Sequence, residues 1–282
     1  MKQTLTRRML ITSSAFGLLT ASVPGVLFAR SGKMMPANDK RSYRYPSLDD
    51  ELVSEVVGAS HFNLDRVKEL VDKRPELARA CWDWAFGDFE TAIGAASHTG
   101  RRDIVEYLIS KGARPDIFTY AMMGAYDAVK SMIEARPGVQ SVAGPHGITL
   151  LQHANVGLRS KDISEAQKAQ NEKLIAYLEG LGNADLRQTN LELTEAQQQK
   201  YLGDYMYGEG PEDGFSVKLN MRKLLSLGKL GKFGGGLYRK GDQIFEYNGI
   251  TSIDVSFQLE GDWVVSLTIQ EPDLTLLAKK VS

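Results

Sequence analysis

The segments DRVKELV at residues 65–71, DIVEYLI at 103–109 and DAVKSMI at 127–133 align without gaps, and KLIAYL at 173–178 is a weaker fourth copy. Counting from the second residue of each of the first three segments as position i, apolar residues fall at i, i+1, i+4 and i+5, with Arg66 as the exception. These positions make one narrow stripe on each predicted helix. A helix this short buries such a stripe only when neighbouring helices stack on both sides. The repeated segments therefore predict a stack of helix pairs, an architecture that more often binds a partner than performs chemistry.

The repeat spacing supports the same architecture. Equivalent positions at Arg66, Ile104, Ala128 and Leu174 are 38, 24 and 46 residues apart. Their mean spacing is close to the roughly 33-residue period of ankyrin repeats. We expect about four helix pairs over residues 48–185.

A different periodicity begins at Phe215. Segments such as FSVKL, QIFEY, IDVSFQL and WVVSLTI alternate apolar and polar residues between Gly, Asp and Pro turns. This pattern predicts an antiparallel β domain, sheet-like or barrel-like, over residues 194–282, with a short first helix capped by Thr194 and a linker at 186–193. The expected fold class is therefore α + β with two domains.

The N-terminus reads as an export signal. Arg7 and Arg8 precede an apolar run that ends near Ala29, and no acidic residue occurs before Asp39. This is a twin-arginine pattern, although an ordinary signal with two adjacent arginines remains an alternative. Both interpretations assign residues 1–29 to export, 30–47 to a flexible tether and the product to the periplasm. The run is too polar for a stable membrane span after processing.

The charge balance and the single cysteine limit which partners and which chemistry the sequence predicts. Without residues 1–29 the chain has 31 basic against 35 acidic residues, a balance that argues against a nucleic-acid partner. Cys81 is the single cysteine and can form no internal disulfide. It is more simply a small apolar residue than a nucleophile. We expect no cofactor.

Residues 91–100, TAIGAASHTG, with Asp103 to Val105 and Lys111 to Ala113 after them, resemble the ankyrin-repeat consensus, as does ITLLQHA at 148–154. Gly94 and Gln152 stand where that family usually has a His. The resemblance covers about residues 48–185. It implies protein binding through a concave face of turns and inner helices.

The C-terminal part resembles a small β domain often appended to serine β-lactamase-like exported hydrolases. YLGDY at 201–205 and FSVKL at 215–219 carry the resemblance, together with residues 254–257 and 264–269. The catalytic motifs Gly-x-Ser-x-Gly, Ser-x-x-Lys with its partners and His-Glu-x-x-His do not occur. The sequence therefore predicts a protein that is not an enzyme.

An aromatic segment, WDWAFGDF at 82–89, falls where a finger between the first two repeats is expected to protrude. Exposed aromatic rings anchor partners well. Alternatively, two of the rings fold back and cap the first repeat. The predicted partner-binding residues are Trp82, Trp84, Phe86, Phe89, Phe118, Tyr120 and His146.

The four histidines are His61, His98, His146 and His153. They show neither an i, i+4 spacing nor a short loop with cysteines, so we expect no metal site. Carboxylates such as Asp83, Asp88, Glu90 and Asp103 are plentiful, but the sequence does not pair them.

The predicted function is recognition of an unidentified envelope protein by an exported, non-enzymatic binding module. One alternative is a hydrolase-associated or small-ligand site in the β domain that uses Tyr201, Tyr205 and Trp263. Another is a protective role toward an exported enzyme. The sequence leaves the partner and the oligomeric state open.

Overall fold

In the residues that the structure describes, eight helices form the first part of the fold. The computed structural model describes residues 44–160, 163–232 and 234–281. The predicted export signal at 1–29 and the tether as far as residue 43 lie outside the described residues. The helices are α2 (Asp50–Ala59), α3 (Leu64–Lys73), α4 (Ala92–His98), α5 (Arg102–Ser110), α6 (Ile117–Met122), α7 (Tyr126–Ala135), α8 (Leu150–Gly157) and α9 (Glu165–Leu181).

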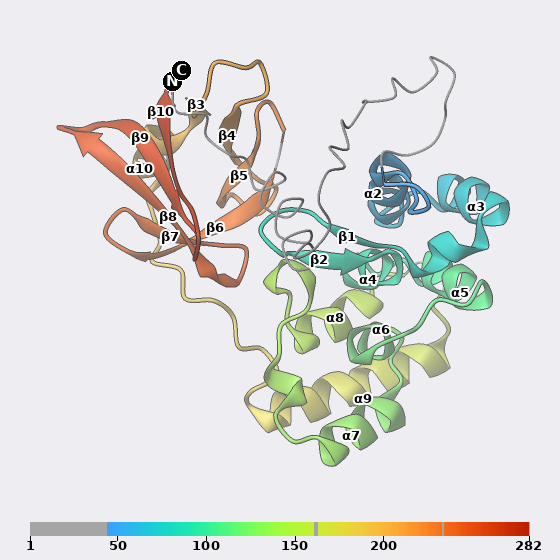
Figure 1. The fold of residues 1–282 in the computed structure, drawn as a ribbon. Coiled ribbons are helices and arrows are strands. Elements are labelled where there is room, and N and C mark those ends of the chain that lie inside the picture. The colour runs from blue at the N-terminus through green and yellow to red at the C-terminus, as the bar shows by residue number, and fades with distance from the viewer. Residues whose placement is uncertain (1–43, 161–162, 233, 282) are drawn as a thin grey trace, which may run out of the picture. The chain divides into compact units, whose positions relative to one another are not determined.

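These helices pack as consecutive pairs, α2 with α3, α4 with α5, α6 with α7 and α8 with α9 (Figure 1). The first members of the pairs also contact one another in a row, from α2 to α8. Most residues of the apolar stripes expected from the repeated segments are buried, for example Ile104 and Leu108 in α5 and Leu174 and Leu178 in α9, whereas Ile109 and Met132 are exposed. The predicted helices and their buried faces are therefore present.

The expectation of an ankyrin-like solenoid has to be corrected, because the pairs are not equivalent. Helix α6 has 6 residues and α9 has 17. After α3 the chain forms a 3₁₀ turn, η1 (Pro75–Arg79), and the hairpin β1 (Cys81–Asp83) and β2 (Phe89–Thr91). After α7 it forms two other 3₁₀ turns, η2 (Val139–Ser141) and η3 (Pro145–Gly147). Local caps and turns set these unequal lengths, so the structure shows a mixed helical part and no regular solenoid.

Side-chain caps fix where the helices begin. The Thr91 hydroxyl accepts a hydrogen bond from the Gly94 amide at the start of α4. Thr149 and Gln152 form a capping box at α8, and Ser164 and Gln167 form one at α9. The cap at Thr91 matters most here, because it places β2 directly against the first turn of α4.

The second part of the fold is a closed antiparallel barrel of eight strands. Its strands are β3 (Gly203–Met206), β4 (Gly214–Leu219), β5 (Leu225–Lys229), β6 (Gly235–Gly241), β7 (Ile244–Tyr247), β8 (Ile250–Glu260), β9 (Trp263–Gln270) and β10 (Thr275–Lys280). Each strand pairs with the next, and β10 closes the barrel by pairing with β3. The predicted antiparallel, barrel-like part is confirmed.

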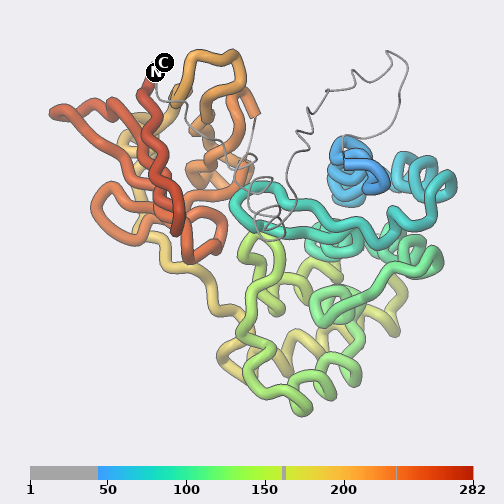
Figure 2. Tube along the Cα trace, viewed as in Figure 1, coloured from blue at the N-terminus to red at the C-terminus, as the bar shows by residue number. Residues whose placement is uncertain are grey.

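Figure 2 shows an extended segment leading from α9 to the barrel, where α10 (Glu195–Tyr201) precedes the first strand. Thr194 caps α10 as expected. Aromatic rings fill the barrel, with Phe257 edge-on to Tyr201, Tyr205 and Phe245. Trp263 is 79% exposed, so it does not join Tyr201 and Tyr205 in one pocket. Within the described ranges, every helix is too short or too polar to cross a bilayer.

A glycine in α8 sets how closely α8 approaches α6. A Cβ atom on Gly157 would lie 2.1 Å from the Met122 backbone oxygen. We therefore expect Gly157→Ala to lower the free energy of unfolding by about 2–3 kcal/mol, measured by urea denaturation, because two backbones would have to separate. Gly180 in α9 has open space around its Cβ position. As the control, Gly180→Ala should raise stability by up to ~1 kcal/mol. Equal effects of the two substitutions would contradict this packing.

Candidate metal centre

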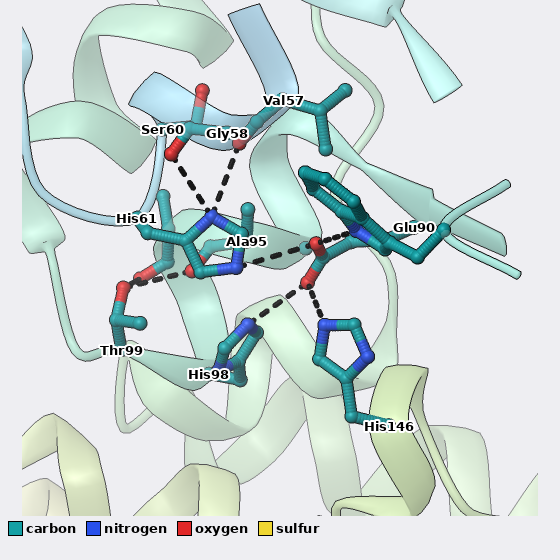
Figure 3. Close-up of polar contacts among 12 residues, drawn as sticks. Val57, Gly58, Ser60, His61, Glu90, Ala95, His98, Thr99 and His146 are labelled. Atoms are coloured by element: carbon teal, nitrogen blue, oxygen red, sulfur yellow. Dashed lines mark hydrogen bonds and ion pairs between the residues drawn. The ribbon is translucent and has the colours of Figure 1, made fainter. Parts of the chain in front are cut away.

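Three histidine side chains converge on one buried carboxylate in the helical part (Figure 3). One ligand atom from each of His61, Glu90, His98 and His146 lies within 4.8 Å of the corresponding atoms of the other three. These residues come from four separate segments. They are the only such group of metal-ligating side chains found in the described part of the chain.

Two of the residues lie at helix ends, and the other two lie within short elements. His61 follows α2, and His98 is the last residue of α4. Glu90 lies at the centre of β2, paired with Trp82 of β1. His146 lies in η3 with a φ of 58°, a left-handed conformation that side chains other than glycine rarely adopt. Strain of this kind concentrates at functional sites.

The distances match those between neighbouring ligands of one ion. His98 Nε2 is 2.9 Å and His146 Nε2 is 3.3 Å from Glu90 Oε1, and His61 Nε2 is 3.4 Å from Glu90 Oε2. Zn–N and Zn–O bonds of about 2.0–2.2 Å at angles between 90° and 110° place ligand atoms about 3.0–3.5 Å apart. The three His–Glu90 distances therefore fit neighbouring ligands of one ion, while the four ligand atoms together lie within 4.8 Å of one another.

The orientation of the His61 ring decides which of its two nitrogen atoms carries a proton and which faces Glu90. Its Nδ1 lies 3.2 Å from the Val57 carbonyl oxygen and 3.1 Å from that of Gly58. A carbonyl oxygen only accepts hydrogen bonds, so Nδ1 carries the proton. Burial lowers the pKa of His61, although Glu90 opposes this effect. In the neutral ring with its proton on Nδ1, the lone pair of Nε2 faces a Glu90 oxygen at 3.4 Å, and a cation between the two atoms would satisfy both.

A second carboxylate orients His146. The Asp88 carboxylate accepts from the His146 backbone amide at 3.0 Å and lies 2.7 Å from the ring Nδ1. Asp88 also accepts a hydrogen bond from Asn248 Nδ2 at 2.5 Å. Burial alone would lower the pKa of His146, but Asp88 and Glu90 together raise it to about 10. A carboxylate on the outer ring nitrogen is the usual second-shell arrangement of a metal-binding histidine.

Asn248 brings this carboxylate into contact with the barrel. It occupies the two-residue turn between β7 and β8 with Gly249, and their φ angles are 47° and 84°. Two consecutive left-handed residues make the hairpin turn that Asn-Gly favours. Because the Asn248 side chain also accepts from the Gly236 amide, it is fixed from both ends.

Glu90 itself is fully buried and only partly satisfied. Trp84 Nε1 donates to Oε2 at 2.7 Å. Glu90 Oε1 and His98 Nε2 are close, but neither has a hydrogen bond of acceptable geometry. Burial would raise the pKa of Glu90, but His146 and His98 outweigh it and hold the pKa far below its usual range, so the group is ionised. This buried anion is aimed at the centre of the cluster.

A cavity opens on one side of the cluster. Its volume is about 450 Å³, and its lining includes His61, His98 and His146 but not Glu90. Trp84 and Tyr247 supply aromatic walls. Water or a small molecule in this cavity would therefore approach an ion held by the four residues from the side of the three histidines.

The seven predicted partner-binding residues do not form one surface. Trp82 packs against the core of the first helix pairs, and Phe118 and Tyr120 pack against the core around α8 and α9. Phe86 contacts Tyr247 of the barrel edge-on, with ring centroids 4.9 Å apart. Trp84 and His146 belong to the cluster, and Phe89 alone among the seven is largely exposed, at 63%. Their role in partner binding stays a prediction.

The expectation of no metal site rested on spacing within single segments, and the structure removes that reason. One signal in the sequence pointed to the cluster. His61 and His98 stand at similar places after the first helices of successive pairs, and α2 and α4 pack together. Their rings lie 4.9 Å apart between centroids. Glu90 and His146 lie in irregular connections, whose position no periodicity predicts.

We expect Asp88→Asn to lower the pKa of His146 from about 10 towards its ordinary value of 6.5, because the neutral amide no longer stabilises the imidazolium. The proton dissociation constant should rise by roughly tenfold or more. An NMR titration of the histidine rings in metal-free protein measures it. Asp83→Asn, on the same hairpin, is the matched control, since Asp83 binds only the Gly87 amide among the contacts found for its side chain in the described residues. An unchanged His146 titration in Asp88→Asn would show that Asp88 does not control this ring.

Comparison with known proteins assigns no family. No family model matches the chain. A segment of 79 residues is 35% identical to Alpha-latrocrustotoxin-Lt1a of Latrodectus tredecimguttatus, a match that covers 25% of this chain and 5% of the toxin. The chain thus corresponds to a small fraction of that protein.

These findings correct the family identification made from the sequence. The ankyrin-repeat identification is not supported, because no family model matches and the similar segment covers a quarter of the chain. The comparisons also give no support to the resemblance to the domain appended to β-lactamase-like hydrolases, and the C-terminal part is a closed barrel of eight strands. The site must therefore be interpreted from its own geometry.

Proposed function

We propose that this protein binds one divalent transition-metal ion through His61, Glu90, His98 and His146. The observation that supports the proposal best is the convergence of four ligand atoms, with His61 Nδ1 against the Gly58 carbonyl oxygen and its Nε2 turned to the buried Glu90 carboxylate at 3.4 Å. In the neutral form of His61 with its proton on Nδ1, two electron-rich atoms would face each other inside the protein without a cation. With an ion between them, both become ligands.

The donor set indicates the class of ion. Three imidazoles and one carboxylate suit Zn²⁺, Fe²⁺, Co²⁺ or Ni²⁺, whereas Mg²⁺ and Ca²⁺ prefer oxygen ligands. The outer shell suits the same ions, because backbone carbonyls hold His61 and Asp88 holds His146. Trp84 likewise fixes the Glu90 carboxylate.

The cavity on the histidine side bears on what the ion would do. A bound ion with open positions there would act as a Lewis acid and bind a further ligand or water. The residues of the chain hold the ion, orient the carboxylate and screen the site with Trp84 and Tyr247. This arrangement supports metal-dependent ligand binding more directly than a purely structural site, which would be closed on all sides.

Metal-free protein titrated with Zn²⁺ should bind one ion per chain with a dissociation constant of roughly 1 μM or below, measured by calorimetry. His98→Ala and Glu90→Gln should each weaken binding at least ~100-fold, because each removes a direct ligand. Circular dichroism checks that the variants remain folded.

His153→Gln is the matched control for this titration. His153 is the fourth histidine and is buried, but its Nδ1 binds the Thr149 carbonyl oxygen and it is not part of the cluster. Its replacement should leave Zn²⁺ affinity within about twofold. If the wild-type protein binds Zn²⁺ no better than His98→Ala does, the four residues form an ion-pair cluster without a metal function.

Recognition of an envelope protein, without catalysis, remains a second proposal. It is favoured by the exposed ring of Phe89 on the β1–β2 hairpin. We expect Phe89→Ala to reduce cross-linking to a periplasmic partner by roughly tenfold without altering thermal unfolding, because an exposed anchor contributes to binding and not to the core. Phe62→Ala removes another exposed ring outside the hairpin and serves as the control. Equal cross-linking by all three proteins would end this second proposal.

A further inference from the structure

The wall of the cavity opposite the histidines comes from the barrel and carries a positive charge. Asn220 and Arg222, from the turn between β4 and β5, line it together with Gly235 and Gly236 of β6. The candidate metal position and the Arg222 guanidinium thus open into the same space of about 450 Å³. A cavity of this size holds a small molecule.

Arg222 is fixed in place but not neutralised. Its Nη2 donates to the Tyr238 hydroxyl at 3.0 Å, and the guanidinium lies beside Gly236, where a Cβ would be 3.6 Å from Nη2. Among the residues that the structure describes, no carboxylate forms an ion pair with it. A guanidinium has five N–H donors in a planar fork that matches an oxyanion, so most of its donors remain for a ligand.

The neighbouring polar groups are also donors. The Asn220 side-chain oxygen accepts from the amides of Arg222 and Leu224, which leaves its NH₂ group for the cavity. The Tyr247 hydroxyl accepts from the Gly235 amide, which leaves its own O–H to donate. Burial raises the pKa of Tyr247 to about 12, so this hydroxyl keeps its proton.

The side-chain oxygens of Asp88 and Asn248 in the lining already accept hydrogen bonds. Asp88 accepts from the His146 amide, the His146 ring and Asn248. The Asn248 oxygen accepts from the Gly236 amide. The cavity therefore offers N–H and O–H donors and the positive charge of Arg222, and its lining carboxylate, Asp88, is engaged by three donors.

From this distribution we propose that the cavity binds a small organic oxyanion, with one oxyanion group paired to Arg222 and a second oxygen donor directed at the metal. Trp84, Ile148 and Tyr247 line the space with apolar surface that suits a short carbon chain. This inference rests on the proposed metal function. It adds the class of ligand, a small molecule with carboxylate or phosphate groups, because the guanidinium fork fits both.

Co²⁺-loaded protein provides the test, since the visible absorption of Co²⁺ changes when a ligand enters its coordination sphere. Succinate is the first probe and should shift the spectrum in a saturable way. Arg222→Ala should raise the dissociation constant of succinate at least ~10-fold and leave the Co²⁺ affinity unchanged, because Arg222 touches the ligand and not the ion. Inorganic phosphate, titrated in parallel, distinguishes a phosphate ligand from a carboxylate one.

Two controls make the result specific. Lys223 is the next residue along the chain and carries the same charge, but its side chain does not line the cavity. Lys223→Ala should therefore bind succinate with the same dissociation constant as the wild-type protein. Succinamide, which lacks charge, should leave the Co²⁺ spectrum unchanged. Equal succinate binding by wild type and Arg222→Ala, or binding of succinamide, would overturn the ligand proposal while Co²⁺ binding still supports the metal site. A protein that takes up no Co²⁺ would remove both proposals.

Discussion

A buried carboxylate needs cations or hydrogen-bond donors around it, and Glu90 imposes this requirement on the helical part of the fold. An isolated buried charge costs several kcal/mol, so its surroundings are organised to offset that cost. Trp84 supplies one donor, and His98, His146 and His61 approach the remaining lone pairs. In the proposed site, a divalent ion bound by the three rings would add the remaining positive charge beside this carboxylate.

The barrel contacts the carboxylate that holds His146 through Asn248. Asn248 reaches Asp88 from the turn between β7 and β8, and Asp88 holds the backbone and the ring of His146. The left-handed φ of His146 persists because these contacts over-determine its position. The same turn brings Tyr247 against Phe86 of the β1–β2 hairpin. The lining of the cavity therefore comes from both parts of the fold, with His61, His98 and His146 from the helical part and Arg222, Tyr247 and Asn248 from the barrel.

Periodic patterns in the sequence predicted the regular elements well. Ile104 and Leu108 are buried as their helical stripe required, and the alternating segments after Phe215 form the barrel. The positions of Glu90 and His146 could not be predicted, because both residues lie in irregular connections without a repeating pattern. They come close to His61 and His98 only when segments far apart in the sequence pack together. Aromatic residues of the hairpin were assigned to partner binding from their type and from the expected finger between the first two repeats, but Trp84 holds Glu90 and Phe86 packs on Tyr247. The ankyrin identification rested on the repeated helical pattern, and that pattern did not reveal the unequal helices and the β1–β2 hairpin between the pairs.

The most direct test of the central claim is a crystal structure of the protein grown with Zn²⁺, with anomalous diffraction recorded on both sides of the zinc absorption edge. The account predicts one strong anomalous peak about 2.0–2.2 Å from the Nε2 atoms of His61, His98 and His146 and from a Glu90 oxygen. His61 Nδ1 should still donate to the carbonyl oxygens of Val57 and Gly58. An anomalous map with no peak between these four side chains, at a Zn²⁺ concentration well above that of the protein, would contradict the account.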